Sequence, residues 1–162
     1  MAEKQHHYRV RVTWTGNEGV GTRGYRDYKR GYEISAPGKA AIAGSSDPGF
    51  HGDAALWNPE ELLVASISAC HKLWYLHLCS AAGVVVEGYD DTAEGLMVED
   101  GDGGGRFVSV TLRPRIALAP GADAAKAARL HHDAHEKCFV ANSVNFPVTV
   151  APRFETATAG AS

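Results

Sequence analysis

The chain has 162 residues, of which 44% are hydrophobic and 22% are charged. This length and composition suit one domain with its own core, so we predict a single domain over residues 1–155 and a disordered tail over 156–162. The net charge of −3 argues against a surface that binds nucleic acid. The first residues lack the features of a signal peptide, which predicts a cytoplasmic location. Three cysteines in a reducing compartment favour thiol chemistry over structural disulfides.

The first third of the chain predicts two strands and a long loop. Residues 8–14 alternate, with Tyr8, Val10, Val12 and Trp14 on one face, as in a half-buried strand. Weaker alternation over 28–35 predicts a second strand. Residues 36–57 are rich in glycine and proline and show little periodicity, so we expect a long surface loop, which is often functional or mobile.

A long helix is predicted after this loop. Asn58 can cap it, Pro59 suits its first turn, and Glu60 and Glu61 favour the positive end of the helix dipole, while Gly83 supplies a stop. Apolar residues then cover nearly every direction around the axis, so the helix must be buried on all sides. A second subunit would supply part of the wall most easily, which predicts a homodimer.

The same helix is long enough to cross a membrane. However, the Cys70-His71-Lys72 interruption and the two leading glutamates are costly in lipid, so we expect no membrane partner.

The second half of the chain predicts more strands around one further helix. Strand-like runs over 84–98 and alternation over 106–118, joined by the glycine-rich turn 100–105, predict an antiparallel pair. The alanine-rich stretch 123–137 predicts a second helix, and residues 144–154 a last strand with prolines that suit a sheet edge. Strands and helices do not alternate regularly, so the fold class is α+β.

The cysteines divide into one pair and one isolated residue. Cys70 and Cys79 lie nine residues apart in one helix, on opposite faces and about 13 Å apart, so they cannot form a disulfide. Cys138 follows the second helix and can approach Cys70 if the two helices pack together, which makes these two the plausible pair. We interpret Cys79 as a small buried apolar residue. Cys70 precedes His71 and Lys72, and Cys138 follows His135 and Lys137; nearby positive charge lowers a thiol pKa.

These segments resemble a known family. The run Asn58-Pro-Glu-Glu-Leu-Leu-Val-Ala-Ser-Ile-Ser-Ala-Cys70 is similar to the helix of the osmotically inducible and organic hydroperoxide resistance (OsmC/Ohr) family, in which Asn-Pro-Glu precedes the peroxidatic cysteine. Ala134-His-Glu-Lys-Cys138 resembles the segment that supplies its resolving cysteine, and the resemblance extends from Val12-Thr-Trp-Thr-Gly16 to the final strand. It implies an OsmC-like fold with antiparallel sheets packed around a long buried central helix, and an intertwined homodimer with active sites at the subunit interface.

The resemblance also implies a chemistry. The family reduces organic hydroperoxides without metal, haem or flavin, which implies no cofactor here. Cys70 would attack the peroxide and become a sulfenic acid, and Cys138 would condense with it to a disulfide. An external dithiol or a lipoyl-type reductant would then reset the enzyme.

The family uses an arginine that holds the thiolate and a glutamate that orients the arginine. Glu60 matches the glutamate, but residues 39–57, where one branch carries the arginine, contain none. Arg23, Arg26 and Arg30 remain; we favour Arg30, then Arg26, because the sequence around Arg30 is the more regular strand. Ten residues separate Glu60 from Cys70, about 15 Å in one helix. Either the helix begins later, or Glu60 comes from the other subunit, which we favour.

Two alternatives remain open. His131, His135 and Cys138 fall at i, i+4 and i+7, nearly one helix face, and with Cys70 and His71 they could form a zinc set. Alternatively, the chain is a dimeric ligand-binding protein that kept the fold but lost the chemistry. The missing loop arginine and three aromatic residues near the expected pocket suggest this second reading: Trp57, Trp74 and Tyr75.

Overall fold

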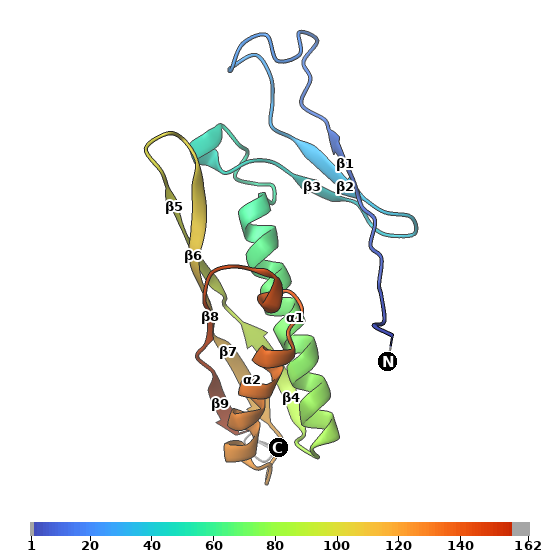
Figure 1. Cartoon of the computed structure of the whole chain (residues 1–162), viewed down its shortest axis with the longest axis vertical. Coiled ribbons are helices and arrows are strands. Elements are labelled where there is room, and N and C mark those ends of the chain that lie inside the picture. The colour runs from blue at the N-terminus through green and yellow to red at the C-terminus, as the bar shows by residue number, and fades with distance from the viewer. Residues whose placement is uncertain (1, 157–162) are drawn as a thin grey trace, which may run out of the picture. The chain divides into compact units, whose positions relative to one another are not determined.

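The computed structural model describes residues 2–156, and Figure 1 shows the chain. The chain divides into two compact units, Met1–Leu62 and Leu63–Ser162, which are described in turn.

The first unit contains a small antiparallel sheet. Its strands are β1 (Arg11–Trp14), β2 (Tyr32–Ser35) and β3 (Ile42–Gly44), in the order β1-β2-β3. Gly44 pairs with Tyr32, and a Cβ at Gly44 would meet the Tyr32 ring, so only glycine fits there. The strands predicted over 8–14 and 28–35 are therefore present but shorter.

The predicted loop over 36–57 is wrong in part, because it contains β3 and a short 3-10 helix. This helix, η1 (Pro48–Phe50), is capped by Asp47, whose side chain accepts a hydrogen bond from the Gly49 amide. Three-residue elements are too short to produce a periodic signal in the sequence.

Helix α1 (Pro59–Ala81) begins and ends where the sequence predicts. The Asn58 side chain accepts a hydrogen bond from the Glu61 amide at 2.8 Å, and the Glu61 carboxylate accepts one from the Asn58 amide at 3.2 Å. This reciprocal arrangement is a capping box. Gly83 adopts the left-handed conformation that commonly ends helices.

Burial of α1 within the chain is confined to one stripe. The stripe consists of Ile67, His71, Tyr75 and Cys79, spaced four residues apart. Only 22% of the most apolar stretch of α1 is buried, and Leu73 on the opposite side is 64% exposed. The helix is long and apolar enough to cross a membrane by length and composition, as core helices of soluble proteins also are. Its cover on the remaining sides does not come from the described residues of its own chain.

The second unit contains two three-stranded sheets. Strands β4 (Val86–Asp91), β7 (Pro114–Leu118) and β9 (Arg153–Thr156) form one sheet in the order β4-β7-β9. Strands β5 (Glu94–Glu99), β6 (Gly105–Leu112) and β8 (Val148–Val150) form the other in the order β5-β6-β8. The chain passes from one sheet to the other between β4 and β5, between β6 and β7, and between β8 and β9.

Three predictions for these strands need correction. The runs 84–98, 106–118 and 144–154 each contain two strands, because the chain changes sheet within each run. At Arg113, between β6 and β7, the backbone amide donates to the Asp91 side chain at 2.7 Å. The sheets are mixed, not purely antiparallel, since β8 runs parallel to β6 and β9 runs parallel to β7. Thr156 belongs to β9; the rest of the predicted tail, 157–162, lies outside the described residues.

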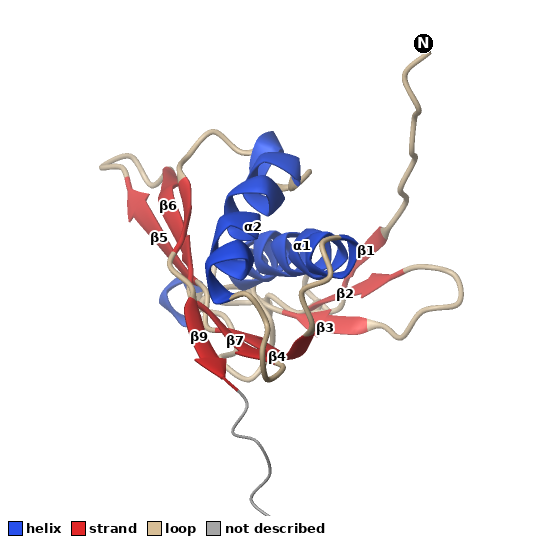
Figure 2. Cartoon of the chain, turned by 90° about the horizontal axis from the view of Figure 1, so that it is seen from below, coloured by secondary structure: helices blue, strands red, loops and turns tan. Residues whose placement is uncertain are grey.

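Helix α2 (Ala124–Lys137) confirms the second predicted helix. Asp123 caps it by accepting a hydrogen bond from the Lys126 amide at 2.9 Å. Figure 2 shows α1 and α2 on the same face of the β4-β7-β9 sheet. A buried cluster joins these elements through Tyr75, Ile116 and Ala127, and a second cluster joins α1 to the other sheet through Ile67, Val110 and Val148. The α+β class is confirmed.

Candidate active site

Cys70 and Cys138 lie next to each other in the second unit. Cys70 is in the middle of α1, and Cys138 is the residue that caps the end of α2. A hydrogen bond and a charge interaction with the Cys70 thiol both raise the pKa of Cys138, so the two side chains interact. Both thiols are reduced and no disulfide joins them. The packing of α2 on α1 therefore brings the two predicted cysteines together.

The two thiols have different surroundings. Cys138 is fully buried, whereas Cys70 is partly exposed. Burial raises the pKa of Cys138 to about 11, although the Ala141 amide, 3.5 Å from its sulfur, lowers it. Cys138 is therefore a protonated thiol at neutral pH. The interaction with the Cys70 thiol also favours the protonated form of Cys138.

Cys79 is separate from this pair. It is 1% exposed and belongs to the buried cluster with Val84 and Ile116. Burial raises the pKa of Cys79, although a hydrogen bond with Tyr75 lowers it. Its interpretation as a buried apolar residue is confirmed.

A buried pair of histidines joins the same two helices. His71 of α1 and His131 of α2 are 1% and 4% exposed, and their Nε2 and Nδ1 atoms lie 2.9 Å apart. His131 stacks on the Tyr75 ring, with centroids 3.7 Å apart and an interplanar angle of 6°. Desolvation lowers the pKa of His71 to about 4 and that of His131 to about 3. Both imidazoles are neutral at pH 7.

The sequence suggested His71 and His131 only as zinc ligands, and their direct pairing was not predicted. The signal was present, because His71 shares the four-residue spacing of Ile67 and Tyr75, and His131 is flanked at the same spacing by Ala127 and at three residues by Ala134. Small alanines on α2 allow close approach of the two helices, and this predicts burial of any polar side chain between them.

Three imidazole nitrogens around the pair lack partners. His71 Nδ1, His131 Nε2 and His135 Nδ1 are buried without a hydrogen bond among the described residues. Within residues 2–156, no group of three or more His, Cys, Asp or Glu side chains has the arrangement of a metal site. The predicted zinc set is therefore not assembled in this structure, and the unpartnered nitrogens require another explanation.

The predicted glutamate and arginine are not paired in the described structure. Glu60 lies in the first turn of α1, which is continuous to Cys70, and its Oε2 atom is buried without a partner. The Arg30 guanidinium instead donates to the Tyr25 and Tyr28 carbonyls, each at 2.5 Å, and lies over both rings. The helix does not begin later than predicted, so Glu60 remains about 15 Å along the axis from Cys70.

Aromatic side chains adjoin the cysteine pair. Trp74 follows Cys70 by one helical turn, and Phe139 follows Cys138 directly. Their rings form an edge-to-face pair with centroids 5.5 Å apart, and Phe139 is 68% exposed. The Lys137 ammonium lies 5.8 Å from the Trp74 ring centroid. This group, called the aromatic rim below, offers an apolar surface beside the two thiols.

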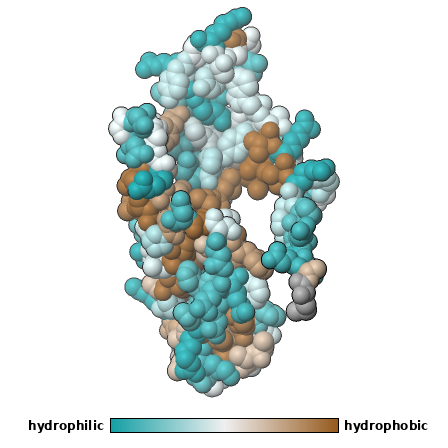
Figure 3. Space-filling view, in the orientation of Figure 1, coloured by the Kyte–Doolittle hydropathy of each residue, from teal (hydrophilic) through white to brown (hydrophobic). Residues whose placement is uncertain are grey.

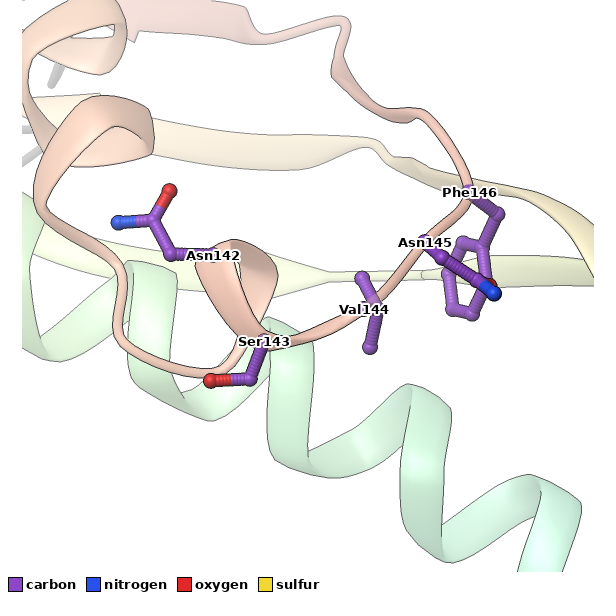
Figure 4. Close-up of a pocket in the computed structure, with 5 residues that line it drawn as sticks. All are labelled: Asn142, Ser143, Val144, Asn145 and Phe146. Atoms are coloured by element: carbon purple, nitrogen blue, oxygen red, sulfur yellow. The ribbon is translucent and has the colours of Figure 1, made fainter.

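A pocket of about 490 Å³ lies on the segment after η2 (Ala141–Ser143). Figure 4 shows its lining, which consists of Asn142, Ser143, Val144, Asn145 and Phe146. The lining contains neither a thiol nor an ionisable group, so no base lies in it to activate the Ser143 hydroxyl, which donates to the Phe139 carbonyl.

Comparison with known proteins supports the resemblance. A family model described as "OsmC-like protein" matches residues 51–153, which include the three cysteines as well as His71, His131 and His135. No curated protein matches the sequence significantly.

Solved structures share the fold over nearly the whole chain. An OsmC-like protein of unknown function from Vibrio cholerae is 28% identical, with a TM-score of 0.81, over 92% of this chain and 100% of that chain. An organic hydroperoxide resistance protein from Legionella pneumophila is 20% identical, with a TM-score of 0.65, over 93% and 98%. The organic hydroperoxide resistance protein of Bacillus subtilis is 22% identical, with a TM-score of 0.59, over 91% and 98%. At these identities the last two show the fold alone.

Proposed function

The chain belongs to the OsmC-like protein family, and from this premise we propose that it is a cysteine-based peroxidase that reduces organic hydroperoxides. The interaction between a partly exposed Cys70 and a buried, protonated Cys138 carries the proposal. This asymmetry fits a peroxidatic cysteine that substrate can reach and a resolving cysteine that it cannot.

The first step is attack by the Cys70 thiolate. Its sulfur displaces alkoxide from the hydroperoxide, so the O–O bond breaks, an S–O bond forms, and the alkoxide takes up a proton to become an alcohol. The neighbouring Cys138 thiol is protonated, and its S–H would stabilise the negative charge on the attacking sulfur. Cys70 becomes a sulfenic acid.

The second step is condensation of the two cysteines. The Cys138 sulfur attacks the Cys70 sulfenic acid, an S–S bond forms and water leaves. Cys79 takes no part, because it lies in the core on another face of α1. An external dithiol or lipoyl-type reductant then reduces the disulfide and returns the protein to its starting state.

Organic hydroperoxides are the favoured substrates because of the aromatic rim. The exposed Phe139 ring lies next to Cys138 in sequence and packs edge-to-face on Trp74. An alkyl or aryl group gains contact with such a surface, whereas hydrogen peroxide has nothing to place there.

The proposal includes a homodimer with a shared site. The exposed side of α1 and the unpartnered Glu60 Oε2 are both consistent with a second subunit. We propose that Glu60 orients Arg30 beside the Cys70 of the other subunit, and that the protein works in the cytoplasm. In this arrangement Arg30 exchanges its present carbonyl partners for Glu60 and the thiolate.

Thiol counting tests the two-cysteine chemistry. One equivalent of cumene hydroperoxide should remove two of the three titratable thiols, and mass mapping should find Cys70 linked to Cys138. Cys70→Ser should abolish peroxide consumption, whereas Cys138→Ser should allow one turnover and stop as the sulfenic acid. Loss of all three thiols, or a Cys138→Ser variant that never reacts, would contradict the assignment.

A further inference from the structure

The disulfide-forming step requires a proton acceptor. Cys138 must lose its proton to attack the sulfenic acid, yet it is fully buried and its pKa is raised to about 11. The thiolate fraction at pH 7 is therefore about 1 in 10,000. A base within the protein would remove the proton during the attack, so that the free Cys138 thiolate would not have to form first.

The Asp91 carboxylate is not available to accept the Cys138 proton. Asp91 of β4 faces His71 and influences the pKa of that histidine. One of its oxygens already accepts a hydrogen bond from the Ser68 hydroxyl, and the other accepts from the Arg113 amide at 2.7 Å. Tyr75 also cannot serve, because its hydroxyl donates to the Ala127 carbonyl at 3.0 Å and burial raises its pKa.

The histidine cluster meets the requirement. His71 and His131 are hydrogen-bonded to each other, and His135 of α2 faces His71 closely enough to influence its pKa. Each ring keeps one buried nitrogen without a partner. His135 precedes Cys138, the residue that caps α2, by three residues, the spacing at which side chains along a helix are neighbours, and the Cys138 amide donates to the His135 carbonyl at 3.3 Å.

The cluster also has a route to water. His135 is only partly buried, whereas His71 and His131 are almost fully enclosed. A proton accepted by one nitrogen of a hydrogen-bonded imidazole pair can leave from the other by a change of tautomer.

We propose that His135, backed by the His71–His131 pair, is a proton relay that accepts the Cys138 thiol proton as the disulfide forms. This inference rests on the proposed peroxidase function and deepens it.

Disulfide formation exchanges one bond for another and releases water. The Cys138 sulfur attacks the Cys70 sulfur, the S–S bond forms and the S–O bond of the sulfenic acid breaks. Cys138 is oxidised and Cys70 is reduced. The Cys138 proton passes to the imidazole and from there to the departing hydroxide, which leaves as water.

Rapid-mixing experiments on the full-length protein separate this step from the first. The reduced protein is mixed with one equivalent of cumene hydroperoxide between pH 5.5 and 8.5. Sulfenic acid is trapped with a dimedone probe, and the disulfide is measured by mass spectrometry. His135→Gln is compared with the unaltered protein and with His132→Gln, a matched control because His132 lies on the same helix with its side chain 75% exposed.

The relay predicts a specific pattern. His135→Gln should form sulfenic acid at the normal rate but close the disulfide about 100-fold more slowly, the scale typical of a lost general base. Its closing rate should rise about tenfold per pH unit, as attack by free thiolate requires, whereas that of the unaltered protein should rise less steeply because the acceptor lies within the protein. Added imidazole should restore closure in His135→Gln, and more basic imidazoles should restore it better. His131→Asn should show the same slowing without a change in the first step.

Two results would overturn the relay. If His135→Gln and His131→Asn formed the disulfide at the normal rate, the relay would be wrong and the peroxidase function would stand. Slow closure that no imidazole restores would show that the histidines only support the fold. If peroxide produced neither sulfenic acid nor the Cys70–Cys138 disulfide in the unaltered protein, the peroxidase function itself would be wrong.

Discussion

The exposed Phe139 ring, next to Cys138 in sequence, bears on the substrate specificity of the proposed peroxidase. Apolar side chains are common on protein surfaces, but Phe139 differs because its ring is oriented by Trp74 and its backbone adjoins Cys138. A ring held in place at low conformational cost is a good contact for an apolar substrate group. In the proposed peroxidase, the aromatic rim would therefore separate recognition of the organic group from the reaction with the peroxide bond.

Removal of this ring should change which peroxide reacts. Phe139→Ala should lower the second-order rate constant for Cys70 oxidation by cumene hydroperoxide about tenfold, because roughly 1 to 2 kcal/mol of apolar contact is lost. The rate constant with hydrogen peroxide should stay the same. Leu96→Ala is a suitable control, since Leu96 is an apolar side chain of β5 that is 56% exposed. An equal loss with both peroxides would contradict a role in recognition.

At the scale of elements, the ends of both helices were readable from sequence and the strand boundaries were not. A helix cap depends on residues close in sequence, so Asn58 and Asp123 predict where their helices begin. The alternation over 106–118 continues through Val110, Leu112, Pro114, Ile116 and Leu118, all of which are buried. A strand that changes sheet without changing its buried face leaves no break in such a pattern.

The candidate site was likewise predictable from the sequence only in part. The cysteine pair could be predicted, because helix geometry excludes a Cys70–Cys79 bridge and the family resemblance implies Cys138 as the partner of Cys70. The His71–His131 contact joins residues 60 positions apart and depends on how α1 and α2 pack. The absence of an Arg30–Glu60 contact within the described chain was equally unpredictable, because the carbonyls that hold Arg30 depend on the path of the loop before β2.

The buried histidine pair makes the α1–α2 contact sensitive to acid. The folded-state pKa values of about 4 for His71 and about 3 for His131 lie below the usual histidine pKa of 6.5. The unfolded chain therefore binds more protons below pH 6.5, so stability is present above this pH and is lost as the pH falls toward 4. The free energy of unfolding, measured with urea, should fall by roughly 5 kcal/mol between pH 7.5 and 4.5 through these two residues.

Replacement of the pair isolates this contribution from that of the carboxylates. The double variant His71→Phe and His131→Phe keeps the stack on Tyr75 but cannot titrate, so its stability should depend much less on pH. His132→Gln should behave as the unaltered protein does. Equal pH dependence in all three proteins would show that the pair is not responsible.

At the scale of the whole molecule, the chain leaves apolar surface uncovered in both units. In the first unit Val10, Val12 and Trp14 are exposed, although they form the apolar side of the β1 segment. In the second unit Leu73 of α1 and Leu96 of β5 are exposed, and Figure 3 shows apolar side chains on the outer surface of the β5–β6 hairpin and the adjoining part of α1. Two separate surfaces of this kind favour a partner that contacts both units.

A second subunit also accounts for Glu60. Its buried, unpartnered carboxylate oxygen calls for a donor, and a guanidinium is the donor best matched to a carboxylate. The continuous helix keeps Glu60 about 15 Å from the Cys70 of its own chain, beyond the reach of a glutamate side chain. If Glu60 serves a cysteine site, that site belongs to the other subunit.

Mixed dimers decide between the two arrangements. A dimer of one Glu60→Ala chain and one Cys70→Ser chain, isolated with two affinity tags, should retain about half of the normal turnover if Glu60 acts across the interface, because one of its two sites is then complete. If Glu60 acts within its own chain, neither site is complete and turnover should equal that of the inactive parents. A mixed dimer of Cys70→Ser and Cys138→Ser chains is the control: these two cysteines interact within one chain, so no complete pair forms and no turnover should return.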